Sequence, residues 1–354
     1  MQQACFQFKT IGAPISSERY GNGHINETYL VKTDSKTWYI LQKINARVFG
    51  NVRNLMHNIT SVTRFLALKD SDPRHVLTVV PTLSGEDFLK DDEGYWRMYI
   101  FVTDSICLER AESDDDFRAS GVAFGRFQSQ LADFSAHTLH EVIPQFHDTV
   151  ARLDALEAAY REDKFARSND TNKEYGQIML RKGDAGSVKD MVHDGKLPLR
   201  VTHNDTKLNN VMLDASTRQP LCVIDLDTVM PGLAGNDFGD SIRFGANYAA
   251  EDERNLQRVG LSLPLFRACA EGFLSTCKDS LSQNEIDTLP LCAKVMTLES
   301  AARFLTDHLK GDTYFHIKYP DHNLVRARTQ LKLLESMEEN YDAMRKIVRE
   351  AASR

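Results

Sequence analysis

The sequence has no long apolar run, no excess of positive charge and no two cysteines at C-x-x-C spacing. No uninterrupted apolar stretch approaches the length of a membrane-spanning helix, and the N-terminus lacks the basic and apolar segments of a secretory signal. A net charge of −7 offers no basic surface for nucleic acid or anionic lipid. The six cysteines include no C-x-x-C pair, which argues against a zinc or redox centre. These absences predict a soluble, cytoplasmic protein that binds neither membranes nor nucleic acids.

The length and composition predict a globular protein of two lobes. The chain has 354 residues, long enough for more than one core, and its content of 42% apolar and 26% charged residues is ordinary. Residues 1–102 are mainly strand-like in pattern, whereas residues 103–354 are mainly helical. We therefore expect an α+β protein with a small β-rich N-terminal lobe and a larger, mainly helical C-terminal lobe, divided near 101–104.

Local patterns predict the elements of the N-terminal lobe. Residues 27–33 and 37–42 flank a polar turn and indicate a β-hairpin. Residues 51–68 carry apolar side chains at helical spacing. Further strands are expected at 76–80, 85–89 and 95–102.

The second part of the chain carries helix signals. Ser113 precedes three aspartates, which is typical of a helix start. The charge-rich residues 157–195 indicate a pair of helices. Further helices are expected at 240–244, 263–277, 285–309 and 324–348, and short strands at 199–202, 211–213 and 221–225. His137, His140 and His147 lack a companion carboxylate at metal-ligand spacing, so we interpret them as surface or core residues.

One segment has the spacing of a phosphoryl-transfer catalytic loop. His203, Asp205 and Asn210 match the H-x-D-x-x-x-x-N pattern, and Asp225 follows at the end of an apolar run. Phosphoryl transfer needs a carboxylate to orient the attacking hydroxyl and oxygen ligands to hold magnesium. Asp205 suits the first role, and Asn210 and Asp225 suit the second. Lys207 could balance charge on the transferred group. The alternative, a polar β-turn, is disfavoured by the second acid.

Five blocks of the chain resemble one group of enzymes. They occupy residues 20–26, 199–210, 224–228, 237–245 and 318–325, beginning with YGNGHIN and ending with KYPDHNLV. With the lobe pattern, they resemble the aminoglycoside phosphotransferase and choline kinase group of protein-kinase-like enzymes, and within it the bacterial N-acetylhexosamine 1-kinases. The resemblance implies a bilobal protein-kinase-like fold. It also implies ATP as co-substrate, Mg²⁺ as cofactor, and transfer to the 1-hydroxyl of N-acetylglucosamine or N-acetylgalactosamine.

The resemblance implies roles for a loop in the N-terminal lobe. Gly21 and Gly23 would belong to a loop over the nucleotide, from which His24 and Asn26 reach the sugar. Both side chains can donate and accept hydrogen bonds, as recognition of hydroxyl and acetamido groups requires. Taken alone, the Asn-Gly pair at 22–23 would indicate a type I′ hairpin turn.

Further implied contacts involve the hinge and the helical lobe. Tyr99 and Phe101 lie in the implied hinge, whose backbone would read the adenine edge. Arg303 and Tyr314 are implied to meet the sugar, although spacing alone would make the first a surface charge and the second a core aromatic. His203 is expected to support the catalytic loop.

One feature departs from the protein kinases, which pair a lysine on the third strand with a helix glutamate. Here strand alternation places Gln42 on the inward face and Lys43 on the other, and residues 51–68 contain no Glu. The ion pair is therefore expected to be missing. We expect triphosphate binding to depend more on magnesium, Lys207 and the loop backbone.

Four charged residues near these motifs have two interpretations each. Asp227 is either a neighbour of the metal site or a cap of the turn at Pro231 and Gly232. Asp237 and Asp240, with Arg243, form either a scaffold beneath the catalytic loop or, as the sequence favours, helix caps.

The sequence thus predicts an ATP-dependent N-acetylhexosamine kinase that is a monomer or weak oligomer. Choline and aminoglycosides are cationic and need an acidic pocket, which His24, Asn26 and Arg303 do not supply. Homoserine carries a carboxylate that Arg303 could hold, so a homoserine- or choline-type kinase stays an alternative. A catalytically inactive nucleotide-binding module is a third possibility, disfavoured by the intact catalytic acids.

Overall fold

The computed structural model describes residues 1–21 and 25–354 and divides the chain into two compact units. We call the first the sheet unit; it comprises Met1–Cys107, Asp133–Pro144 and Val211–Pro231. We call the second the helical unit; it comprises Leu108–Ala132, Gln145–Asn210 and Gly232–Arg354. The chain is a mixed α+β protein with a mainly helical larger part, so the predicted fold class is confirmed. The division into lobes 1–102 and 103–354 stays a prediction.

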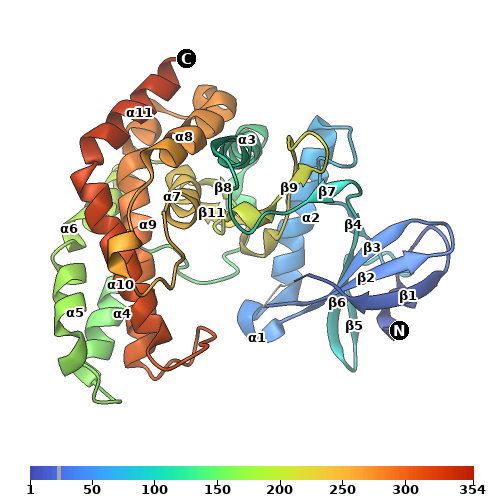
Figure 1. Ribbon diagram of the computed structural model, residues 1–354. Helices are drawn as coiled ribbons and strands as arrows, with labels where there is room; N and C mark the ends of the chain where they lie inside the picture. Colours follow the sequence, from blue (N-terminus) through green and yellow to red (C-terminus); the bar gives the residue numbers. More distant parts are fainter. Residues whose placement is uncertain (22–24) are drawn as a thin grey trace. The chain divides into compact units, whose positions relative to one another are not determined.

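An antiparallel sheet forms the centre of the sheet unit. Among the described residues it has six strands in the order β1-β2-β3-β6-β4, with β5 paired to β6 (Figure 1). The strands are β1 (Pro14–Arg19), β2 (Glu27–Thr33), β3 (Trp38–Ile44), β4 (Val79–Val80), β5 (Leu89–Asp91) and β6 (Gly94–Ile100). The predicted hairpin is confirmed, with Leu30 opposite Ile40 in register.

Two predicted strands of this unit are largely wrong. Only Val79–Val80 of the segment 76–80 is a strand, and the segment 85–89 begins in a turn instead. Gly85 has a φ of 90°, and its N–H donates to the Thr82 carbonyl at 2.9 Å. Such a backbone conformation favours glycine and ends the extended run, so the strand starts only at Leu89.

The sheet unit also contains helices and a second small sheet. These elements are α1 (Ala46–Phe49), α2 (Val52–Lys69), β7 (Ser105–Ile106), β9 (Val211–Asp214) and β10 (Pro220–Val223), with 3₁₀ turns at Gln3–Gln7, Ala136–Thr138 and Leu226–Thr228. The second sheet has the order β10-β9-β7. Asn51 caps α2 by accepting the Asn54 N–H, so the predicted helix 51–68 is confirmed. The core of the unit includes Phe8, Val31, Leu41, Trp96 and Met98.

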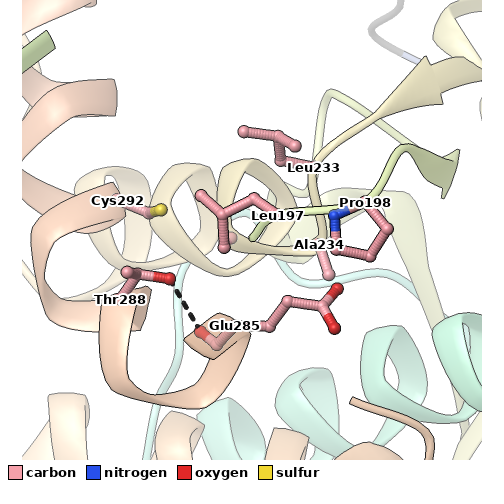
Figure 2. Close-up of a pocket in the computed structure, with 8 residues that line it drawn as sticks. Leu197, Pro198, Leu233, Ala234, Glu285, Thr288 and Cys292 are labelled. Atoms are coloured by element: carbon pink, nitrogen blue, oxygen red, sulfur yellow. Dashed lines mark hydrogen bonds between the residues drawn. The ribbon is translucent and has the colours of Figure 1, made fainter. Parts of the chain in front are cut away.

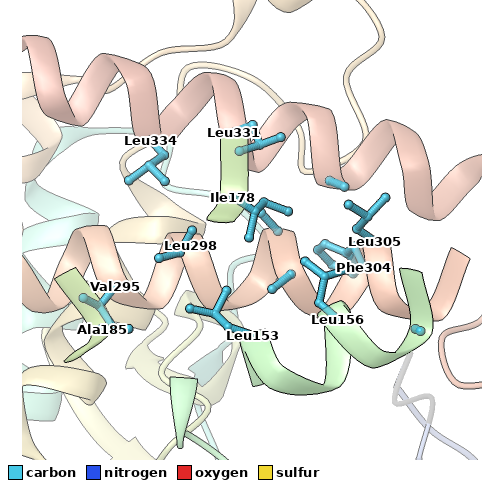
Figure 3. Close-up of a cluster of buried hydrophobic side chains, with 14 of the residues drawn as sticks. Leu153, Leu156, Ile178, Ala185, Val295, Leu298, Phe304, Leu305, Leu331 and Leu334 are labelled. Carbon is cyan, nitrogen blue, oxygen red and sulfur yellow. The ribbon is translucent and has the colours of Figure 1, made fainter. Parts of the chain in front are cut away.

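The helical unit is built around the long helix α9. Its helices are α3 (Asp114–Gln130), α4 (Thr149–Glu162), α5 (Asn172–Met179), α6 (Lys182–His193), α7 (Ala234–Gly245), α8 (Leu263–Cys277), α9 (Gln283–Leu309), α10 (His322–Glu339) and α11 (Tyr341–Ser353). Shorter elements are β8 (Arg200–Thr202) and 3₁₀ turns at Asn169–Thr171, Leu208–Asn210, Leu256–Arg258 and Lys278–Ser280. Strand β11 (Met230–Gly232) has its first two residues in the sheet unit and its last in the helical unit. Figure 3 shows apolar side chains from α4, α5, α6, α9 and α10 packed together, among them Leu153, Ile178, Leu298 and Leu331.

Two helix predictions need correction. The segment 157–195 forms parts of three helices rather than two, because Asp163 adopts a left-handed conformation that ends α4. The segment 324–348 is broken at Asn340, whose Nδ2 donates to the Ser336 carbonyl and competes with the helix backbone. By contrast, Ser113 forms the predicted cap of α3. Within the described part of the chain, none of the helices has the length and hydropathy that a membrane crossing needs.

Candidate active site

The predicted catalytic loop brings three of its residues together in the helical unit. Lys207 Nζ lies 2.8 Å from Asp205 Oδ1. Asn210 donates through Nδ2 to Asp205 Oδ2 at 3.1 Å and to the Asp205 carbonyl at 2.8 Å. The 3₁₀ turn Leu208–Asn210 directs the Asn210 side chain back toward Asp205. Each carboxylate oxygen of Asp205 therefore has one fixed partner and further acceptor capacity.

The charges in this loop stabilise each other. Burial alone would raise the pKa of the Asp205 carboxyl, but the Lys207 ammonium outweighs it and holds that pKa below its ordinary value. Burial would lower the pKa of Lys207, but the Asp205 and Asp240 carboxylates raise it above its ordinary value. At neutral pH the loop therefore presents a carboxylate next to an ammonium group.

Asp237 on α7 holds the start of the loop. Its carboxylate accepts the His203 N–H at 2.9 Å, the Asn204 N–H at 2.7 Å and the Gln128 amide at 2.7 Å. His203 is fully buried against Phe124. Its Nδ1 accepts the Asp205 N–H at 3.3 Å, so its predicted supporting role is confirmed.

Asp240, also on α7, holds the middle of the loop. Its Oδ2 accepts the Thr206 N–H at 3.0 Å, while Arg243 donates to its Oδ1. Ser241 donates to the Thr206 carbonyl at 3.0 Å. The favoured interpretation of these acids as helix caps is therefore wrong, and the scaffold alternative is what the structure shows. Both acids are buried, and a buried carboxylate needs hydrogen-bond donors. On α7 the N–H groups of the catalytic loop are those donors.

Helix α9 carries the predicted sugar contact Arg303. Its guanidinium lies over the Phe146 and Phe315 rings, at 5.2 and 5.6 Å, and 4.0 Å from Glu299. With only 19% of its side chain exposed, Arg303 is no ordinary surface charge. Its contact with a sugar stays a prediction.

Tyr314 lies on a loop that Asp307 of α9 organises. The Asp307 carboxylate accepts the N–H groups of Thr313, Tyr314 and Phe315, at 2.8 to 2.9 Å, and the Asn323 amide at 2.8 Å. Tyr314 itself is 64% exposed, so the core-aromatic alternative is wrong. A fixed backbone with an exposed phenol suits ligand contact, which stays a prediction.

The sheet unit contains a buried ion pair that the sequence analysis missed. Arg97 on β6 donates through Nη1 and Nη2 to both carboxylate oxygens of Asp227, and through Nε to Gln42 at 2.9 Å. Burial would lower the pKa of Arg97, but the Asp227 carboxylate raises it above its ordinary value. Lys43 lies over the Trp96 ring instead, so the predicted alternation is confirmed. A charge in the middle of an apolar strand was the available signal.

Asn26 and Asp225 adjoin this ion pair. Asn26 is buried, donates to Asp227 Oδ2 and accepts the Asn45 N–H at 3.0 Å. Among the described residues, these contacts use one of the two donors and one of the two acceptor positions of its amide, and the predicted sugar contact stays a prediction. Asp225 follows β10 in a left-handed conformation, with φ of 58°. Asp227 does not cap the following turn, because Arg97 and Asn26 occupy its carboxylate.

Arg97→Met is expected to lower the free energy of unfolding by about 3–5 kcal/mol, because it leaves the Asp227 carboxylate buried without its cation. Urea unfolding followed by circular dichroism measures this. The matched control is Arg97→Met with Asp227→Leu, which removes both charges and should recover most of the loss. A single variant as stable as the parent would contradict the role assigned to this pair.

The nucleotide-side predictions have different outcomes. Gly21 has a φ of 72°, while Gly23 and His24 lie outside the described residues. Tyr99 pairs with both β3 and β4, and the Phe101 N–H donates to the Trp38 carbonyl at 3.1 Å. The adenine contacts stay predictions.

The oxygen atoms of Asn210 and Asp225 have the chemistry that Mg²⁺ prefers. Among the residues described, no group of three or more His, Cys, Asp or Glu side chains could hold a metal. Magnesium often takes only one or two protein ligands and fills its octahedron with phosphate and water. The two residues belong to different compact units, and their action as one ligand set stays a prediction.

The helical unit also contains a small pocket, which is lined by residues other than those of the catalytic loop (Figure 2). It is lined by Leu197, Pro198, Leu233, Ala234, Gly235, Glu285, Thr288 and Cys292. Glu285 is already paired with Arg200 Nε at 2.6 Å and caps α9. The pocket includes none of the predicted site residues.

A family model described as Phosphotransferase enzyme family (APH) matches residues 16–271, most of the chain. The chain belongs to this family. Similar solved structures include a microcompartment-associated aminopropanol kinase, with 17% identity, 97% of both chains covered and a TM-score of 0.60. An aminoglycoside phosphotransferase from Alicyclobacillus acidocaldarius has 10% identity, 98% and 96% coverage and a TM-score of 0.64. An amicoumacin kinase in complex with AMP-PNP and Ca²⁺ has 14% identity, 95% and 91% coverage and a TM-score of 0.60. At these identities the likeness confirms the predicted protein-kinase-like fold.

Proposed function

We propose that this chain transfers the γ-phosphoryl group of ATP to the anomeric 1-hydroxyl of an N-acetylhexosamine. The observation that carries phosphoryl transfer is the Asp205 carboxylate, which Lys207 keeps ionised and Asn210 orients. Membership of the phosphotransferase family supports the reaction class. The choice of sugar is supported by the resemblance to N-acetylhexosamine 1-kinases across nearly the whole chain.

The reaction follows from the groups present. Asp205 accepts a hydrogen bond from the 1-hydroxyl and then its proton, while the hydroxyl oxygen attacks the γ-phosphorus in line. A new O–P bond forms as the bond to the ADP oxygen breaks, and the C1–O bond of the sugar stays intact. Lys207 offsets charge on the transferred group. Asn210 and Asp225 would hold Mg²⁺, which neutralises phosphate charge when bound.

The charges of the helical unit favour a neutral acceptor over a cationic one. Arg303 lies near Glu299, and burial together with Arg303 lowers the pKa of Arg152. Two guanidinium groups close together disfavour an ammonium substrate. Amino alcohols are the second candidate, because two of the similar structures are kinases named for aminopropanol and choline.

The product provides the test of this proposal. Incubation with ATP, Mg²⁺ and a panel of sugars and amino alcohols is expected to yield a sugar 1-phosphate from N-acetylglucosamine or N-acetylgalactosamine, identified by phosphorus NMR. Because phosphorylation at C1 destroys the reducing end, the product should no longer reduce alkaline copper. A phosphorylated sugar that still reduces copper would place the phosphate on another hydroxyl. Turnover of choline or aminopropanol without turnover of any sugar would overturn the acceptor assignment.

A further inference from the structure

His147 lies between the catalytic loop and helix α9. Its Nδ1 is 2.8 Å from Glu299 Oε1, and its Nε2 is 3.0 Å from the Asn204 carbonyl oxygen. Both side chains of the His147–Glu299 pair are buried, with 8% and 1% exposed. Thr149 donates a further hydrogen bond to Glu299 Oε2 at 2.7 Å. His147, interpreted from the sequence as a surface or core residue, is thus part of a buried polar network.

The two partners of His147 fix its protonation state. A carboxylate oxygen and a peptide carbonyl oxygen are both acceptors, and a neutral imidazole has only one N–H to donate. With Glu299 ionised, both contacts are hydrogen bonds only if His147 is the doubly protonated imidazolium. Burial alone would lower the pKa of His147, but the Glu299 carboxylate raises it above its ordinary value. Burial would likewise raise the pKa of Glu299, and His147 holds it below its ordinary value.

The contacted carbonyl belongs to the peptide that joins Asn204 to Asp205. His147 binds the C=O of this peptide, and His203 accepts its N–H at 3.3 Å. Asn204 has a φ of 65°, a left-handed conformation that asparagine adopts readily. Two histidines therefore set the plane of the peptide from which the catalytic carboxylate projects.

The same network reaches the predicted sugar contact. Glu299 precedes Arg303 by one turn of α9, and its Oε1, which binds His147, lies 4.0 Å from Arg303. Phe146, next to His147, lies under the Arg303 guanidinium at 5.2 Å. A single buried imidazolium thus joins the peptide before Asp205 to the segment that carries Arg303.

We propose that His147 is a positioning residue that acts only as an imidazolium: bound to Glu299, it fixes the peptide before Asp205 and links that peptide to α9. This role rests on the proposed phosphoryl transfer at Asp205. Loss of one proton removes one of its two hydrogen bonds and releases either the loop or the helix. Phosphoryl transfer should then decrease as pH rises through the pKa of His147.

The direction of this pH dependence follows from the surrounding charges. Glu299 of α9 and Asp240 of α7 favour the charged imidazole. Arg303, 4.0 Å from Glu299 Oε1, and Arg152 of α4 are the cations that interact with the Glu299 carboxylate. Because the pKa of His147 in the folded protein is raised, His147 keeps both of its hydrogen bonds at every pH below the ordinary histidine pKa. One of these hydrogen bonds is lost only as the pH rises through the raised pKa.

Nitrogen-15 NMR of the enzyme without nucleotide or acceptor tests the protonation state directly. At neutral pH both ring nitrogens of His147 are expected to show imidazolium shifts, and Glu299→Gln should lower the pKa of His147 by about one unit or more. A singly protonated His147 at neutral pH in the parent protein would overturn the proposal. This measurement does not depend on which acceptor the enzyme uses.

The pH profile of kcat tests the positioning role. Glu299→Gln should move the alkaline limb to lower pH by the same shift that NMR measures. The uncharged pair His147→Gln with Glu299→Gln should abolish that limb and lower kcat by about 10- to 100-fold. His193→Gln, at a histidine that is 90% exposed, is the matched control and should change nothing. If the alkaline limb of Glu299→Gln lies at the same pH as that of the parent, the proposal is overturned. If no acceptor in the panel is phosphorylated, the proposed function fails, and slow ATP hydrolysis then reports the same limb.

Discussion

Asp205→Asn is expected to lower kcat by about 10²- to 10⁴-fold while the protein stays folded and binds ADP. Asparagine preserves the shape of the side chain and its contact with Asn210, but it cannot accept the proton of the attacking hydroxyl. Initial rates with ATP and N-acetylglucosamine measure the loss, and circular dichroism with ADP titration checks folding and nucleotide binding. Retention of more than about a tenth of the parent rate would contradict general-base catalysis by Asp205.

A matched acid on the surface provides the control for this experiment. Asp194, exposed at the end of α6, pairs with Lys196 as Asp205 pairs with Lys207, so Asp194→Asn removes a similar ion pair without touching the loop. Its rate should equal that of the parent. Because the pKa of Asp205 is depressed, the parent should keep its activity at mildly acidic pH and lose it only as pH falls through that lowered pKa.

The elements that the sequence predicted well are those with local signals. The β2–β3 hairpin has alternating strands around a polar turn, and α3 begins at a serine with its capping box. Helix α8 has the predicted bounds because Ser262 and Pro264 mark its start. The catalytic loop was also found locally, since three residues at fixed spacing define it.

The contacts that the sequence missed join residues far apart in the chain. Arg97 and Asp227 are separated by 130 positions, and His147 and Glu299 by 152. Arg97 stands out as a charge within an apolar strand, but the other three do not stand out in their own segments. Only the fold brings opposite charges together in a space that excludes water, where burial makes their pairing necessary. The scaffold role of Asp237 was under-rated for the same reason, because its partners belong to the loop 33 and 34 positions away.

Replacement of Asp225 is the other substitution with a large expected effect. Asp225 has a φ of 58°, which asparagine tolerates and alanine does not. Asp225→Asn therefore removes the charge without backbone strain, and Asp225→Ala removes the ligand as well. Loss of the metal contribution, worth several kcal/mol, should lower kcat by about 10²- to 10⁴-fold in both variants.

The metal dependence of nucleotide binding separates this role from a structural one. In the parent, ADP should bind more tightly with Mg²⁺ than with chelator; this difference should shrink in Asp225→Asn, which keeps an amide oxygen, and vanish in Asp225→Ala. Mn²⁺ should replace Mg²⁺, since it accepts the same oxygen ligands. Because Asp225→Asn leaves the backbone unstrained, a loss of activity in that variant points to the lost charge and not to strain. Full activity of the parent in excess chelator would exclude Asn210 and Asp225 as magnesium ligands, because a phosphoryl group could then be transferred without the ion that they are proposed to hold.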